Sequence, residues 1–539
     1  HDRRYHSIPQ RSLLRCRRSL LAAYYVAPYL LDSHDYRRRF SGPWLASLTN
    51  WWLSRDFSSG HHCDTLVQLH EKYGKFVRIG PNHISISDPD ALEAVYGHSN
   101  GLLKSDFYDA FNPGSERDAF NVRDRADHTV KRKRIANIFS TQNILAFEPR
   151  VREHLQRFCA QLDMRCEQSL KGISGFNWKA KDNRAVINCP PQFSYLNFDI
   201  ISDLALGVAF GMIDRQQDSA PTSLSSSTKA NVKNINPIRL NATGGQGATA
   251  LGPYPPWAQK LLLFCTPFNI PSLISLYGFQ KTASAAVDAR VARMEKEGLG
   301  NQERGADLLD KLFEIKNADG SRLSRQEIDA QAFVVLSAGS DTTSNSLSGL
   351  CYYIASNPFA KKKLQEELDS VLLFAETNED QPGYAIPNYE DIKNLPYLNA
   401  CVKEGLRLYS TVGIGLPRVV PEGKTLTVSG ETFNAGSVVS VPTYLTHRSS
   451  VWGPDAEKYR PERWLEDTSG SLNKYFGAFS LGPRACLGRN LANMNLLLIA
   501  ATFFHRYDVE LASPTTKLKI KEGITRESTH CEVSIKRRV

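Results

Sequence analysis

One long helical segment constrains the fold of this chain most strongly. Ser324 and Glu327 have the spacing of an N-terminal capping box, and the helical pattern behind them continues to Asn357-Pro358. A helix of about 33 residues is about 50 Å long at 1.5 Å per residue. Such a helix must cross the whole body of a globular domain. We therefore expect its middle to be buried.

The middle of this expected helix contains residues that a buried helix normally avoids. It reads Ala338-Gly339-Ser340-Asp341-Thr342-Thr343. Glycine costs about 1 kcal/mol relative to alanine inside a helix, and a buried aspartate costs more unless it is paired. We therefore predict a functional site at Asp341 and Thr342. The competing interpretation is a structural pair of threonines in a kinked core helix.

Composition and charge exclude several classes of protein. The chain has 539 residues and a formal charge of +10, and residues 1–39 supply +6 through nine arginines and three aspartates. The remaining excess is too small to favour nucleic-acid binding, and a basic end is more typical of a membrane-surface element. With 41% hydrophobic residues and 23% charged residues, the chain is not collagenous, disordered or polytopic. Ten scattered cysteines without a CxxC pair indicate a reducing compartment.

Residues 1–41 are expected to form a basic tail with a partial membrane-anchor-like segment. The longest apolar stretch runs over residues 20–31 and includes Pro28. A membrane-spanning helix needs about 20 apolar residues, so this stretch is too short to span a bilayer. An amphipathic or buried segment is the alternative.

The rest of the pattern predicts a mainly α protein with small β-sheets, because the βαβ alternation of a doubly wound sheet is missing. Residues 214–256 are rich in Ser, Thr, Asn, Gly and Pro, and we expect a low-complexity insertion there, either a surface loop or a disordered segment. We predict one large domain over residues 42–539. Its regular elements are expected as strands at 76–87, helices through most of 125–210, a helix at 396–409, strands at 419–441 and a helix at 488–506.

A glycine-flanked cysteine near the C-terminus is the strongest candidate for a ligand. The segment reads Phe479-Ser480-Leu481-Gly482-Pro483-Arg484-Ala485-Cys486-Leu487-Gly488. Cys486 is expected at the N-terminus of the last long helix, where unpaired N–H groups and the helix dipole stabilise a thiolate. Arg484 offers a fork of donors for a carboxylate. The alternative is a buried structural cysteine.

This segment resembles the Phe-x-x-Gly-x-Arg-x-Cys-x-Gly pattern of the haem-thiolate monooxygenases, the cytochromes P450. Five fixed positions coincide by chance in on the order of one chain in ten thousand. The resemblance implies the cytochrome P450 fold and haem b as cofactor, with Cys486 as the axial ligand to iron and Arg484 paired with a haem propionate. A thiolate ligand favours O–O cleavage.

The resemblance implies further cationic partners for the haem propionates. His128 and Arg132 match the family's early Trp-x-x-x-Arg pattern, with His in place of Trp. Arg418, in Leu416-Pro417-Arg418, stands where a later strand often presents a third cation. The alternative for each is a solvated basic residue.

The resemblance also implies a buried charge network that fixes the cysteine loop. Glu404 and Arg407 are three residues apart and share a helix face. In the family, such a Glu-x-x-Arg pair meets an arginine from a Pro-Glu-Arg-aromatic segment, here Arg463. Trp464 stands where Phe is commoner. A weak surface ion pair is the alternative.

The centre of the long helix resembles the family's oxygen-activation motif, Ala/Gly-Gly-x-Asp/Glu-Thr. The Thr342 hydroxyl is expected to bond the Ala338 carbonyl, and Gly339 is expected to leave room for a groove. The resemblance implies that Thr342 holds an ordered water and that Asp341 links it to solvent. Two protons would reach dioxygen by this route.

Several stretches are similar to the fungal benzoate 4-monooxygenase family, namely residues 70–78, 103–111, 338–345 and 416–423. This similarity implies para-hydroxylation of benzoate, or of a related small aromatic acid, to the 4-hydroxy product. It also implies O2 as co-substrate, NADPH-cytochrome P450 reductase as electron donor, and a monomer on the cytosolic face of the endoplasmic reticulum membrane. The alternatives are a P450 for a steroid, fatty acid or secondary metabolite, and a haem-binding sensor or electron carrier. The Asp341-Thr342 pair argues against a carrier.

A benzoate-like substrate needs an apolar slot and one anion-binding group. We expect the slot to be lined by aromatic residues of one short segment and by two residues that follow the Glu-x-x-Arg helix: Phe107, Tyr108, Phe111, Thr411 and Val412. The candidates for the group that binds the carboxylate are Lys104, Ser105 and Arg123.

Overall fold

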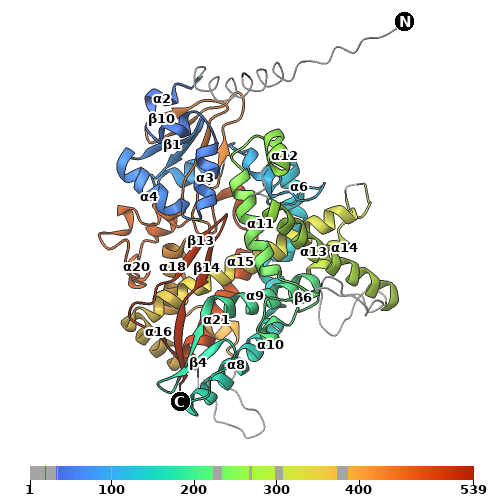
Figure 1. Cartoon of the computed structure of the whole chain (residues 1–539), viewed down its shortest axis with the longest axis vertical. Coiled ribbons are helices and arrows are strands. Elements are labelled where there is room, and N and C mark those ends of the chain that lie inside the picture. Colours follow the sequence, from blue (N-terminus) through green and yellow to red (C-terminus); the bar gives the residue numbers. More distant parts are fainter. Residues whose placement is uncertain are drawn as a thin grey trace.

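The computed structural model describes residues 19, 32, 34–98, 100–221, 234–265, 270–297, 307–317, 319–372 and 386–538. These residues form a mainly helical body with a sheet toward each end (Figure 1). This is the predicted fold class. Most of the anchor-like stretch at 20–31 lies outside the described residues.

The α-helices are α2 (Tyr36–Arg39), α3 (Trp51–Ser59), α4 (His62–Tyr73), α5 (Ala91–Tyr96), α6 (Arg125–Ala136), α7 (Thr141–Leu145), α8 (Glu148–Leu170), α9 (Cys189–Leu206), α10 (Met212–Arg215), α11 (Pro237–Leu251), α12 (Pro256–Cys265), α13 (Ile270–Glu297), α14 (Leu308–Glu314), α15 (Arg325–Ala355), α16 (Pro358–Val371), α17 (Tyr389–Ile392), α18 (Pro396–Tyr409), α19 (Thr443–Thr446), α20 (Glu462–Glu466) and α21 (Arg489–Arg506). Short 3-10 helices are η1 (Trp44–Ser47), η2 (Asp106–Phe111), η3 (Asn137–Phe139), η4 (Ser450–Trp452), η5 (Ser471–Tyr475) and η6 (Gly482–Arg484).

The strands form two larger sheets and three hairpin-like pairs. The first sheet has the order β1-β2-β11-β8-β3, with β11 parallel to β2, and the second has the order β12-β15-β5-β4. The pairs are β9 with β10, β13 with β14, and β6 with β7. Their bounds are β1 (Phe76–Gly80), β2 (His83–Ile86), β3 (Leu103–Lys104), β4 (Trp178–Lys181), β5 (Arg184–Asn188), β6 (Ala220–Pro221), β7 (Asn234–Ile235), β8 (Arg418–Val419), β9 (Leu426–Val428), β10 (Glu431–Phe433), β11 (Val438–Ser440), β12 (Tyr507–Leu511), β13 (Lys519–Glu522), β14 (Arg526–His530) and β15 (Glu532–Arg537).

Helix α15 crosses the middle of the body, as its length predicts (Figure 1). The predicted capping box is present: the Glu327 N–H donates to Ser324 Oγ at 3.2 Å, and the Ser324 N–H donates to Glu327 Oε2 at 3.1 Å. Helices α9, α13, α18 and α21 pack around it. At the crossing with α18, a Cβ on Gly349 would lie 2.4 Å from Tyr409 Cδ2, so only glycine allows these helices to approach this closely.

Strand pairing in the first sheet brings two distant cations together. β3 and β8 are antiparallel, and their register places Lys104 opposite Arg418. Both side chains are buried, at 5% and 4% exposure. Two like charges in this position repel each other, so the sheet edge needs a nearby anion.

The region at 125–210 is not as uniformly helical as predicted, because β4 and β5 interrupt it. Asp182 and Asn183 connect these strands with positive φ angles of 52° and 58°, the conformation of a tight two-residue hairpin turn. β5 then pairs with β15 near the C-terminus. The Asp-Asn dipeptide carries the turn signal, but the pairing with β15 is a tertiary contact that no local pattern contains.

The prediction of a loop or disordered insertion over 214–256 is wrong for residues 237–251, which form α11. This helix packs against α13 and also contacts α3 and α15. A Cβ on Gly244 would lie 3.1 Å from the Leu276 backbone, and one on Gly247 would lie 2.1 Å from Ser272 Cβ. The small residues therefore permit close helix packing. Residues 222–233 of the segment lie outside the described residues.

Residues just before the predicted domain boundary at 42 also pack against the domain. Tyr36 and Phe40 are buried at 0% and 3% exposure and pack against Phe433 of β10. The end of the basic segment is thus part of the domain core. No helix among the described residues is both long and apolar enough to cross a membrane.

We predict that Gly247→Ala destabilises the protein and that Gly245→Ala does not. The new methyl group at 247 meets Ser272 inside the α11–α13 contact, and overpacking of this kind costs about 1–3 kcal/mol. At 245 the nearest atom is Ile524 Cγ2 at 3.8 Å, an ordinary contact, and alanine favours the helix by about 1 kcal/mol. Thermal unfolding of the two variants measures the difference. Equal stability of both variants would refute the packing account of α11.

Candidate active site

The cysteine loop has a conformation that requires glycine at position 482. Ser480 and Gly482 have positive φ angles of 57° and 66°. A Cβ on Gly482 would lie 2.3 Å from the Tyr96 carbonyl oxygen, so a larger residue would push the loop away from α5. The Cys486 N–H donates to the Phe479 carbonyl at 2.8 Å and closes the loop. The sulfur then projects into a cavity.

Burial and local dipoles act in opposite directions on the Cys486 thiol. Burial raises its pKa, while the Gly488 N–H, followed by the charges of Arg132 and Arg489, lowers it. The net direction is upward. The helix terminus therefore favours the thiolate, as predicted, but the protein alone does not compensate for burial. A cation in front of the sulfur would supply the missing stabilisation.

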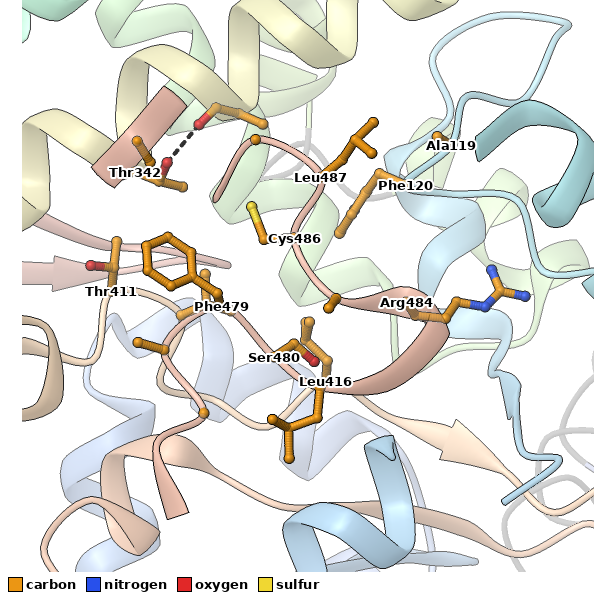
Figure 2. A pocket seen from close by; sticks show the side chains of 18 of the residues that line it. Ala119, Phe120, Thr342, Thr411, Leu416, Phe479, Ser480, Arg484, Cys486 and Leu487 are labelled. Atoms are coloured by element: carbon orange, nitrogen blue, oxygen red, sulfur yellow. Dashed lines mark hydrogen bonds between the residues drawn. The ribbon is translucent and has the colours of Figure 1, made fainter. Parts of the chain in front are cut away.

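The cavity has a volume of about 340 Å³ and lies between the cysteine loop and α15. Figure 2 shows Cys486 and Thr342 on different sides of it, with Phe479, Leu416, Phe120 and Leu487 around it. The Thr342 hydroxyl donates to the Ala338 carbonyl at 2.7 Å, as expected. The Ile201 side chain of α9 packs against Gly339, where we expected an open groove. It comes so close that a Cβ on residue 339 would lie 2.7 Å from it.

Asp341 faces a second chamber of about 160 Å³ rather than the cysteine cavity. The two spaces share several lining residues, Thr342 among them. Thr525 Oγ1 donates to Asp341 Oδ2, and Asn345 Nδ2 donates to Asp341 Oδ1 at 2.8 Å. Burial raises the pKa of Asp341, although both hydrogen bonds oppose the shift. Asp341 and Thr342 thus link the two chambers.

Cations gather at one edge of the cysteine cavity. Its described lining includes four cationic side chains and no carboxylate: Lys104, Arg132, Arg418 and Arg484. Burial, and then the charges of Arg418 and Arg484, holds the pKa of Lys104 well below its usual value. Burial, followed by the charges of Arg484 and Lys104, lowers the pKa of His128 to about 3. His128 is therefore neutral at pH 7, whereas the three arginines keep their charge; Lys104 needs a nearby anion to hold its proton.

Neutral oxygen atoms orient these cations without compensating their charge. Arg484 donates to the carbonyls of Val122 and Arg123 at 2.6 and 2.8 Å, and Arg132 donates to the Ala485 carbonyl at 2.8 Å. Arg418 donates to the Tyr108 hydroxyl at 2.6 Å. The arrangement fits an anionic ligand with more than one negative group.

Glu404, Arg407 and Arg463 meet in the interior. Arg407 forms two hydrogen bonds to the Glu404 carboxylate, at 2.9 and 2.8 Å, and Arg463 Nε donates to Glu404 Oε1 at 2.9 Å. Glu404 and Arg407 side chains are fully buried and that of Arg463 is 2% exposed. Trp464 Nε1 also donates to Glu404, at 3.0 Å, which gives this tryptophan a role that phenylalanine does not fill.

The predicted substrate residues divide between different spaces. Tyr108, Thr411 and Val412 line the cysteine cavity, and Phe111 lines the second chamber. Phe107 does not line either space. It lines a separate cavity on the other side of η2, because the short helix turns successive aromatic rings to different sides.

Two of the three candidates for binding a carboxylate are also misplaced. Ser105 and Arg123 line the separate cavity, and Arg123 is already paired with Asp106 and Asp109. Lys104 alone of the three lines the cysteine cavity.

Sequence reasoning missed the residues that complete the walls from other elements. Phe120 and Leu416 line both chambers, and Asn241 and Gln246 of α11 line the second. Glu527 of β14 also lines the second chamber. The sequence of residues 338–345 indicates where the site is. No sequence motif indicates that residues of α11 and β14 also line it.

Comparison with known proteins identifies the family. The family model for cytochrome P450 matches residues 41–243 and 255–534. The chain belongs to the cytochrome P450 family. A benzoate 4-monooxygenase of Aspergillus niger is 38% identical over 529 residues, covering 96% of this chain and 96% of that protein. A pisatin demethylase of Fusarium vanettenii is 28% identical, covering 88% and 85%. A crystal structure of a cytochrome P450 superposes with a TM-score of 0.69 at 18% identity, covering 88% of this chain and 98% of that one.

The residues of this P450 fit the haem that the family carries. The cavity places a sulfur between apolar walls, and its uncompensated cations at one edge match the two carboxylates of haem. Cys486 would hold the iron, and Arg132, Arg418, Arg484 and Lys104 would hold the carboxylates. The iron would be the cation that the buried thiolate lacks.

We predict that Glu404→Gln destabilises this P450 by about 3–5 kcal/mol, because it leaves buried Arg407 without a counter-charge and Arg463 with Asp455 alone. Glu457→Gln is the matched control. Glu457 pairs with Arg448 at the surface, where its side chain is 71% exposed, and such pairs contribute about 0–1 kcal/mol. Chemical denaturation gives both values. Similar losses in the two variants would contradict a structural role for the buried network.

Proposed function

We propose that this P450 monooxygenase hydroxylates a small aromatic acid at the para position, with benzoate as the substrate and 4-hydroxybenzoate as the product. The observation that carries the proposal is the 38% identity to a benzoate 4-monooxygenase over nearly the whole of both chains. The small second chamber supports it, because a space of about 160 Å³ suits a single aromatic ring better than a steroid.

The haem, when bound, supplies the chemistry of O2 reduction, O–O cleavage and oxygen insertion. Cys486 would hold the iron and contribute electron density through its thiolate. Lys104, Arg132, Arg418 and Arg484 would hold the haem carboxylates. Apolar side chains such as Phe479 and Leu487 exclude water from the buried side.

Thr342 and Asp341 are proposed to deliver the two protons that each turnover consumes. Thr342 already donates its hydroxyl hydrogen to Ala338, so its oxygen can accept a hydrogen bond from a water molecule in the cavity. Asp341 lies behind it in the second chamber. With its pKa raised by burial, Asp341 holds a proton more readily than an exposed aspartate does, and it can pass that proton on.

The aromatic ring of the substrate would lie between α15, the segment after α18 and Phe120. Val334, Ala338, Val412 and Leu416 supply apolar contacts in both chambers. For a ring whose para carbon points toward Cys486, the carboxylate extends into the second chamber. The hydrogen-bond donors there include the side-chain amides of Asn241 and Gln246 on α11, and Asn241 Nδ2 already donates to the Ser337 carbonyl at 3.3 Å.

One observation favours a second candidate, a P450 that acts on a neutral hydrophobic substrate. The described lining of the second chamber contains Asp118, Asp341 and Glu527 but no cation. An anionic substrate therefore gains no salt bridge there and relies on amide donors. A neutral aromatic metabolite avoids this cost.

The electrons are proposed to come from NADPH through a cytochrome P450 reductase, with the chain acting as a monomer on the cytosolic face of the endoplasmic reticulum membrane. Exposed apolar side chains support membrane contact: Trp44 is 70% exposed, Trp257 is 60% exposed and Leu261 is 54% exposed. Trp257 and Leu261 belong to α12, which lies in the upper half of Figure 1. Tryptophan is favoured where one end of a side chain is apolar and the other is wet.

We predict that benzoate shifts the spin state of the ferric holoenzyme in a difference spectrum, and that a steroid of much larger volume does not. Benzamide is the matched neutral ligand. Incubation with reductase and NADPH should then give 4-hydroxybenzoate. A shift with benzamide or a steroid but none with benzoate would overturn the substrate and leave the P450 assignment intact.

A further inference from the structure

Glu527 of β14 lines the same second chamber as Asp341 of α15. It lies in β14, two residues after Thr525, whose hydroxyl donates to the Asp341 carboxylate. On the other side of Glu527 in the chain, the Ser528 N–H donates to Asn345 Oδ1 at 2.7 Å. Asn345 in turn donates to Asp341 at 2.8 Å. These bonds hold the strand against α15 on both sides of Glu527.

The charges around Glu527 favour its protonated form. Burial raises its pKa to about 7, with the charge of Asp341 as the next contribution and Lys521 opposing both. Lys521 is its cross-strand neighbour on β13. Asp118 lines the chamber from the loop before α6, while α11 contributes only amides. Arg526 is engaged on other partners, Glu522 and the Tyr409 carbonyl.

The position of Glu527 connects the interior to the surface. Its side chain is half-buried, and its partner Lys521 is exposed. Asp341, by contrast, is held by two donors within the protein. The chamber that both acids line extends to Thr342, and a bridging water molecule needs only about 30 Å³, a small part of that space. A proton path from solvent to Thr342 therefore passes Glu527 before Asp341.

We propose that Glu527 is the relay residue that returns a proton from solvent to Asp341 in each turnover. The inference rests on the proposed proton-delivery role of Thr342 and Asp341, and it is independent of which substrate binds. The Glu527 carboxylic acid breaks its O–H bond and a new O–H bond forms on Asp341, directly or through one water. The Glu527 carboxylate then takes a proton from bulk water. No electron changes hands, and Glu527 acts through Asp341 rather than on the substrate.

The first test measures protonation without turnover. In the infrared spectrum of the resting holoenzyme, we expect a carboxylic acid C=O band that titrates near pH 7 and is lost in Glu527→Gln. Asp341→Asn removes a neighbouring negative charge, so the midpoint should fall. Lys521→Met removes the opposing positive charge, so the midpoint should rise. A band that Glu527→Gln leaves unchanged would overturn the proposal.

The second test measures coupling, as product formed per NADPH consumed, with whichever aromatic ligand is turned over. Glu527→Gln should lower the rate of product formation by about tenfold or more, raise the yield of peroxide and flatten the pH profile near neutrality. Glu527→Asp should restore part of the coupling, and Glu510→Gln, at an exposed site on β12, should change nothing. Thr342→Ala shows the loss of coupling expected when the residue nearest the cysteine cavity is removed.

If Thr342→Ala uncouples NADPH consumption from product formation and Glu527→Gln does not, the relay role of Glu527 is wrong while the role of Thr342 stands. Full coupling in both variants would overturn the proposed proton delivery as a whole.

Discussion

The unpaired positive charge at the edge of the cysteine cavity is the constraint on which the site depends. Lys104, Arg132, Arg418 and Arg484 come from four distant parts of the chain, and carbonyl or hydroxyl oxygens orient each of them. Buried like charges destabilise a fold unless a counter-charge is present. A ligand with two carboxylates and a metal cation satisfies both the four cations and the buried sulfur.

The interior carries a second set of charges that serves a different purpose. Glu404 is shared by Arg407 and Arg463 and by the indole of Trp464, so it ties α18 to the segment before the cysteine loop. The cation cluster is open to a ligand, whereas this cluster is closed by its own partners. The cation cluster binds the ligand, and the Glu404 cluster fixes the position of the cysteine loop, although both are built largely from arginines.

Much of the fold and some of the site could be predicted from local pattern. The capping box of α15, the proline at the start of α18 and the glycine-flanked cysteine each depend on neighbours within a few residues. The sequence pattern does not reveal helix α11, because its glycines are typical of loops and become helical positions only through close packing on α13. Phe107 and Arg123 were misplaced for a related reason: the pattern gives the segment but not the side to which each side chain turns.

The acids that face Thr342 show the same limit more sharply. Asp341 is visible in the sequence because it breaks a helix rule, but Glu527 breaks none and is ordinary on a strand. Only the packing of β14 on α15, through Thr525 and Ser528, brings it to the chamber. Functional partners that meet through tertiary contact leave no local signal.

The most direct test of the central claim is X-ray absorption at the iron edge of the resting holoenzyme and of Cys486→His. We expect an iron–sulfur scattering shell in the natural protein and its replacement by nitrogen in the variant, since histidine also ligates haem iron. Only nitrogen or oxygen scatterers in the natural protein, or a sulfur shell that persists in the variant, would contradict Cys486 as the ligand.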